Sequence, residues 1–152
     1  MDTKTVLKRL NIIYYGMFLL LVVLATAAYL LIIKEVIPVL DPLSQWGKVI
    51  QYAVIFDVLL TVPGGLWWHK KRCKQIAQIE DEAERLTAYY KSAALRICLV
   101  SNTMLFAIPT YYILGAYMSM MWVAAIAAIG WYFTKPTEKK MYFELHPEEE
   151  QY

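Results

Sequence analysis

The chain has 152 residues, 59% of them hydrophobic, and its mean hydropathy is +0.41. A soluble domain is typically about half apolar. Here the apolar residues are grouped in blocks separated by charged stretches, which indicates membrane spans rather than one water-facing core. The formal net charge of +2 is too small to favour a nucleic-acid-binding protein.

The first apolar block, residues 10–33, follows a basic start, as in a secretory signal peptide. It is too long for the apolar region of a signal and long enough to cross a bilayer, so we expect a retained first helix. Further apolar blocks at 49–68, 94–114 and 117–133 each approach the ~20 residues that a spanning helix needs. The sequence therefore predicts an all-α protein, a four-helix bundle forming one transmembrane domain over 1–152.

The distribution of lysine and arginine predicts the orientation of these spans. Thirteen of the 15 basic residues lie in the N-terminal segment, in loop 69–93 with the first turn after it, or in tail 134–152, and only Lys34 and Lys48 lie on the opposite side. We therefore expect both termini in the cytoplasm and the protein in the bacterial inner membrane, where the lipid bilayer is its first partner.

The loop at 69–93 carries an apolar stripe on an otherwise charged stretch. Its members recur at steps of three and four residues, the period of a helix: Ile76, Ile79, Ala83, Leu86 and Tyr90. Two arrangements fit this pattern. The loop extends the second and third spans into a cytoplasmic helical hairpin, or it lies along the membrane surface.

A faint internal repeat accompanies the four spans. Residues 9–19 align with 96–106, and Gly65-Leu-Trp-Trp-His-Lys aligns with Gly130-Trp-Tyr-Phe-Thr-Lys. Such a repeat is consistent with two tandem helical hairpins in the same orientation, related by an axis along the membrane normal.

Several stretches also suggest a family. Basic residues close the second span, the heptad-like "IAQIEDEAERLTAYYKSAALRI" leads into the third, an "LF" follows there, and "KPTEKKMYFELHPEEEQ" lies near the end. From Pro63 onward the chain resembles a group of bacterial four-span proteins without an assigned activity, some of them distantly similar to the proteolipid hairpins of rotary ATPases. The resemblance implies the four-helix fold. Members often carry Leu-Glu-Gly-Pro where this chain has residues 100–103, Val-Ser-Asn-Thr. This departure removes an intramembrane carboxylate and weakens any inference of ion translocation from the resemblance.

Asp57 is the one acidic residue within a predicted span. An ionisable group at mid-membrane costs about 2.5–3.5 kcal/mol on insertion scales, which makes it a functional candidate. Six residues later, Pro63, Gly64 and Gly65 are expected to break or kink the helix and free its carbonyls. A carboxylate beside a broken helix favours an ion or proton site.

Three interpretations of the role of Asp57 stay open. The first is the ion or proton site. In the second, Asp57 is protonated and joins two helices through a hydrogen bond in a polar layer, whose other candidate members are Asn102, Ser101, Tyr14 and Tyr15. In the third, the carboxylate contacts a partner protein.

A run at the end of the second span is predicted to anchor it at the lipid headgroups: Trp67, Trp68, His69, Lys70, Lys71 and Arg72. The two histidines lie far from any span centre, which excludes a pair of haem ligands. Cys73 and Cys98 form no Cys-x-x-Cys motif and are expected to be free thiols. We predict no metal and no cofactor.

No catalytic motif is visible, so we expect no enzyme. The favoured function is that of a non-catalytic accessory or self-assembling bundle, whose partner is itself or another membrane protein. The alternative is a small transporter or a proton- or cation-conducting oligomer that uses Asp57.

Overall fold

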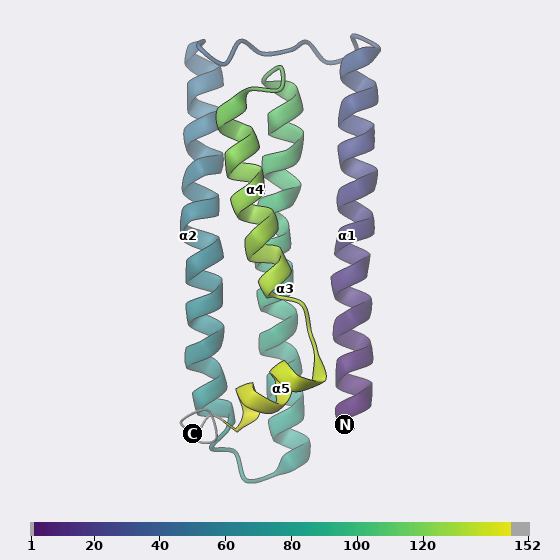
Figure 1. The fold of residues 1–152 in the computed structure, drawn as a ribbon, viewed down its shortest axis with the longest axis vertical. Helices are drawn as coiled ribbons and strands as arrows, with labels where there is room; N and C mark the ends of the chain where they lie inside the picture. The colour runs from purple at the N-terminus through teal and green to yellow at the C-terminus, as the bar shows by residue number, and fades with distance from the viewer. Residues whose placement is uncertain (1, 147–152) are drawn as a thin grey trace.

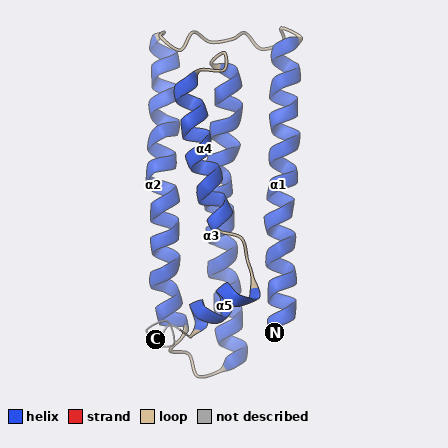
Figure 2. Ribbon diagram, in the orientation of Figure 1, coloured by secondary structure: helices blue, strands red, loops and turns tan. Residues whose placement is uncertain are grey.

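A computed structural model describes residues 2–146 and is all-helical over that range (Figures 1 and 2). Its helices are α1 (Thr3–Ile33), α2 (Gln45–Ile76), α3 (Glu82–Ile113), α4 (Met118–Phe133) and α5 (Glu138–Leu145). The predicted all-α class is confirmed. The acidic end of the expected tail, residues 147–152, lies outside the described range.

The three longest helices run along the bundle axis, and the two short ones lie against them (Figure 1). We call the end that holds the N-terminus, the α2–α3 turn and α5 the basal end. The opposite, distal end holds the loop 34–44 and the α3–α4 turn. α4 returns from the distal end against α3 and α2, and α5 crosses the bundle axis against α2.

Three helices, α1, α2 and α3, are long and apolar enough to cross a membrane. α4 is apolar but has only 16 residues. At 1.5 Å per residue it measures roughly 24 Å, less than the ~30 Å of a typical hydrocarbon core.

The loop expected at 69–93 is mostly helix. α2 continues to Ile76 and α3 already begins at Glu82, so the second and third predicted spans extend into a helical hairpin. Asp81 caps α3 by accepting hydrogen bonds from the backbone N–H groups of Ala83 and Glu84, which lack partners within the helix. Of the predicted apolar stripe, Ile76 and Leu86 are buried, whereas Ala83, in the first turn of α3, is exposed.

The expected break at Pro63, Gly64 and Gly65 is wrong. α2 runs through all three residues without interruption. Proline removes one backbone donor, yet the helix is held on both sides of it because Val62 before it and His69 after it are buried against the bundle. A helix that packs along its length tolerates one missing hydrogen bond.

A tandem repeat of helical hairpins would require α1 and α2 to pack closely against each other. They do not. α1 packs mainly on α3, and α1 and α2 lie on opposite sides of α3 (Figure 1). Loop 34–44 is long enough to connect them across the distal end. Of the two glycines in the aligned segments, Gly130 has a local role: a Cβ on it would overlap the side chain of Val62, so α4 approaches α2 closely only because residue 130 has no side chain.

The buried apolar residues form two clusters, one towards each end. The distal cluster joins α1, α2, α3 and α4. The basal cluster includes Val6, Leu10, Ile76, Leu86, Met141 and Leu145, so α5 packs into the basal end through two of its own side chains. The packing of α5 places its polar face against α2 and α3.

Candidate functional site

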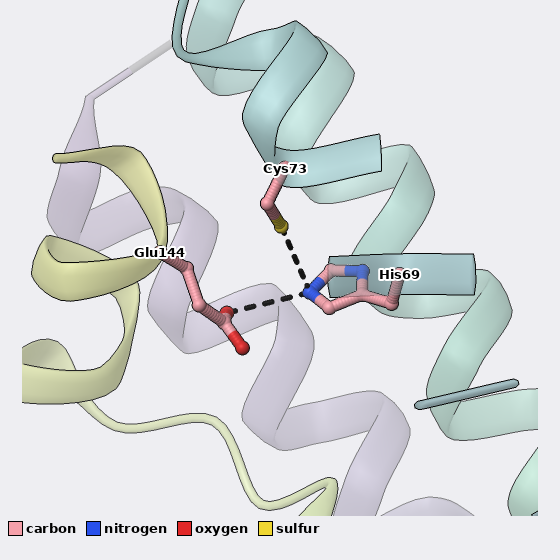
Figure 3. A group of neighbouring side chains, drawn as sticks. All are labelled: His69, Cys73 and Glu144. Atoms are coloured by element: carbon pink, nitrogen blue, oxygen red, sulfur yellow. Dashed lines mark hydrogen bonds and ion pairs between the residues drawn. The ribbon is translucent and has the colours of Figure 1, made fainter. Parts of the chain in front are cut away.

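A group of buried or partly buried polar side chains lies at the basal end, where α2, α3 and α5 meet. α2 contributes His69 and Cys73, four residues apart on one helical face, and α3 contributes Ser92 and Arg96 with the same spacing. α5 contributes Glu144. Figure 3 shows Glu144 and Cys73 directed toward the imidazole ring of His69.

Glu144 accepts hydrogen bonds from three directions. Arg96 Nη1 donates to Oε1 at 2.9 Å, and the Tyr89 hydroxyl donates to Oε2 at 2.6 Å. His69 Nε2 lies 3.3 Å from the same Oε2. The carboxylate therefore connects α5 to both α2 and α3.

These contacts determine the tautomer of His69. A carboxylate can only accept, so Nε2 carries the proton that points at Glu144. Burial lowers the pKa of His69 below its usual 6.5, despite the opposing hydrogen bond to Glu144, and the ring is neutral. Nδ1 then has no proton and accepts the hydroxyl hydrogen of Ser92, whose Oγ lies 2.9 Å away.

The charge of Glu144 follows from the same neighbours. Burial by itself would raise the pKa of this carboxyl, but the hydrogen bond from His69 and the positive charge of Arg96 outweigh it and lower the pKa to about 2. Burial raises the pKa of Cys73 to about 12, so its thiol is protonated. At neutral pH the cluster holds one anion, Glu144, and one buried cation, Arg96.

Three of these side chains could offer donor atoms to a metal ion. One atom each of His69, Cys73 and Glu144 lies within 4.8 Å of the others, and nitrogen, sulfur and carboxylate oxygen are zinc ligands. We predicted no metal from the sequence, yet His69 and Cys73 are four residues apart, and this spacing is the sequence signal that indicates part of the donor set. Glu144 could not have been found, because it joins the others only through the packing of α5.

A cavity of about 640 Å³ opens beside the cluster. Its lining includes five basic residues, Arg96, Lys70, Lys74, Lys139 and Lys140, against one carboxylate, Glu144. A surplus of positive charge repels a divalent cation and attracts an anion. The positive charge of the cavity therefore disfavours a metal ion bound to His69, Cys73 and Glu144.

The predicted polar layer is not assembled as expected. Asp57 is half-buried and its Oδ1 accepts a hydrogen bond from Thr61 Oγ1 at 3.2 Å. Asn102 is exposed on α3, while its neighbour Ser101 is buried. Among the described residues, neither Asp57 Oδ2 nor Ser101 Oγ has a hydrogen-bond partner.

The two tyrosines predicted for that layer lie elsewhere. Tyr14 is buried and stacks on Trp131, with ring centroids 4.3 Å apart and planes at 9°. Tyr15 meets Tyr14 edge-on at 5.3 Å and is exposed. They form an aromatic contact of α1 with α4 rather than a polar bond to Asp57.

The predicted headgroup anchors divide into two groups. Lys70, Lys71 and Arg72 are exposed, as is Trp67, whose ring lies 5.4 Å from the ammonium of Lys71. Trp68 is also exposed. The assignment of His69 to the headgroups is wrong, because its side chain is only 1% exposed and belongs to the buried cluster.

No protein-family model, no curated protein and no solved structure matches this chain. The resemblance to bacterial four-span proteins therefore stays a sequence-based expectation, and the functional argument depends on the geometry alone.

Proposed function

We propose that this chain is a four-span protein of the bacterial cytoplasmic membrane, with both termini in the cytoplasm, that works by association as an accessory or self-assembling subunit. Three helices of spanning length support the membrane part of the proposal. The concentration of basic residues at the basal end supports the orientation. Reporter fusions after Lys74 and Tyr152 should read cytoplasmic and one near Pro42 external; a cytoplasmic signal at Pro42 would contradict the topology.

The observation that carries the association proposal is the open face of α1. Of its 31 residues only Val6, Leu10, Tyr14 and Leu21 are buried, and none after Leu21. The exposed apolar surface includes Leu19 at 65% and Val23 at 56%, and nothing lies within 4 Å of the position where Gly16 would carry a Cβ. Helices associate in lipid by close packing at small residues, which this face offers to a second helix.

Cysteine cross-linking in membrane vesicles tests the proposal. In a background of Cys73→Ala and Cys98→Ala, we expect Val23→Cys on α1 to give a disulfide-linked dimer. Leu59→Cys is the matched control: it is similarly exposed on α2 and equally far in sequence from the distal end of its predicted span. Equal cross-linking at the two positions would indicate random collision, and the proposed α1 interface would be wrong.

Ion or proton movement through Asp57 is a second candidate. One observation favours it: Asp57 Oδ2 is enclosed and has no hydrogen-bond partner within residues 2–146, so one carboxylate oxygen is available to a proton or cation. Proton and potassium flux into liposomes should be present for the wild type and for Asp41→Asn, and abolished in Asp57→Asn. Unchanged flux in Asp57→Asn would exclude this function.

A further inference from the structure

We propose that the basal cavity binds a phosphate-bearing anion on the Nε–Nη2 edge of Arg96. This site is separate from the α1 interface and from Asp57. The proposal therefore does not depend on either proposed function.

The first argument is the hydrogen bonding of Arg96. Its side chain is nine-tenths or more buried, and only Nη1 has a partner, Glu144. Nε and Nη2 are enclosed and find no acceptor anywhere in the described part of the chain. A buried charged donor without an acceptor destabilises the fold, so an acceptor that binds to these two donors would be stabilised there.

The geometry of those two free atoms points to the kind of ligand. Nε and Nη2 lie on one edge of the planar guanidinium and donate in parallel, which matches two oxygens of a phosphate or carboxylate. Glu144 already occupies Nη1. Arg96 lines the basal cavity, so a ligand in that space lies beside the guanidinium and reaches the two donors when the side chains that enclose them move aside.

The second argument is the charge around the cavity. Lys70 and Lys74 of α2 and Lys139 and Lys140 of α5 add four cations to Arg96, and Glu144 is the one carboxylate in the lining. Lys140 donates to the backbone carbonyl of Phe133, so its ammonium is held near the cluster. Burial and the charge of Arg96 lower the pKa of Lys140, and a bound anion would relieve that repulsion.

The size and the apolar wall of the cavity favour a phosphate that carries an organic group over a bare inorganic ion. Its apolar wall consists of Leu66, Phe133 and Phe143, of which the first two lie at the basal ends of predicted spans. A volume of about 640 Å³ exceeds a single phosphate and accommodates an organic group attached to it. Basic pockets between spanning helices on the cytoplasmic side suit lipid phosphates, and a soluble phosphate ester offers the same oxygens.

The experiment uses the full chain in detergent and in nanodiscs. In the lipid arm, native mass spectrometry measures retained phosphatidylglycerol against phosphatidylcholine after delipidation. In the soluble arm, thermophoresis measures binding of inorganic phosphate and of glycerol phosphate. Preference for phosphatidylglycerol with no soluble binding assigns the site to a lipid; binding in the soluble arm assigns it to a free phosphate. Either result supports the proposal.

Two variants test the residues. The double variant Lys70→Gln/Lys139→Gln should weaken binding about fivefold per lysine. Its matched control, Lys71→Gln/Lys135→Gln, removes the same charge from neighbouring positions outside the cavity lining and should bind as the wild type does. Arg96→Lys keeps the charge but loses the paired donors, and should weaken binding about tenfold.

The lysine pair keeps the test decisive even where Arg96→Lys fails to fold, because both lysines are exposed. Equal affinity of the two double variants would overturn the proposal. So would the absence of binding in both arms.

Discussion

The guanidinium of Arg96 and the carboxylate of Glu144, 48 residues apart, form a largely buried ion pair, with Nη1 and Oε1 separated by 2.9 Å and Glu144 19% exposed. Arg96 lies on α3 and Glu144 on α5, so the pair attaches the last described helix to the core of the bundle. Removing one member of such a pair leaves the charge of the other without compensation, so we expect the fold of the basal end to depend on this contact.

Glu144→Gln should destabilise the protein by about 3 kcal/mol, the lower range for breaking a buried ion pair. The substitution preserves the shape of the side chain and removes its charge. Thermal unfolding in detergent and limited proteolysis of α5 measure the effect. Glu138→Gln, which removes the same charge from an exposed position of α5, should behave as the wild type; equal losses in the two variants would show that Glu144 has no special role.

Stability should fall as the pH falls. The pKa of Glu144 is about 2 in the fold against 4.5 ordinarily, so the unfolded chain binds a proton first and the contribution of this group, complete above pH 4.5, is lost toward pH 2. The lowered pKa of His69 acts in the same direction, beginning below pH 6.5. Unfolding midpoints from pH 8 to 3 should show both phases, and Glu144→Gln should lack the more acidic one. A profile that is flat below pH 6.5 would contradict the assignment.

Cys73 should resist maleimide in the folded protein. Its side chain is buried, and burial raises its pKa to about 12, so almost no reactive thiolate is present. In a Cys98→Ser background, labelling should become fast only when α5 detaches, for example in Glu144→Gln. Cys73→Ser/Gln78→Cys, with its thiol in the exposed α2–α3 turn, serves as the reactive control. Rapid labelling of native Cys73 would show that the cluster is open.

Gly130→Ala should destabilise the α2–α4 contact by about 1–3 kcal/mol, the usual cost of overpacking. The added methyl would overlap Val62, whose branched side chain cannot move away freely. Gly64→Ala is the control, because open space surrounds that position. Unfolding in detergent should also show that Val62→Ala rescues Gly130→Ala. Failure of the rescue would locate the strain elsewhere.

The helical class and the long apolar segments were predictable from the sequence because both follow from local properties. A run of about 20 apolar residues forms a helix in lipid, because a helix satisfies all of its backbone hydrogen bonds within the segment. The cap at Asp81 is local in the same sense. The periodic stripe indicated a helix between the second and third spans, although it could not distinguish a hairpin from a surface helix.

The arrangement of side chains was decided by tertiary packing. Ser101 and Asn102 are adjacent in sequence, yet one faces the bundle and the other points out, because successive residues on a helix differ by about 100° in direction. That difference prevented the predicted Asp57–Asn102 pair. Pro63 carries a local signal for a break, and the burial of Val62 before it and His69 after it overrides that signal.

The polar group at the basal end could be predicted only in part from the sequence. Sequence alone determined that basic residues gather near one end of the bundle, whereas the continuation of α2 to Ile76 places His69 and Cys73 on one helical face. Only the tertiary structure decided that Glu144 reaches His69, 75 residues away, and that Arg96 is buried with two donors unused. The physical reason is that Met141 and Leu145 bury themselves in the basal core, and this burial of α5 turns Glu144 inward between α2 and α3.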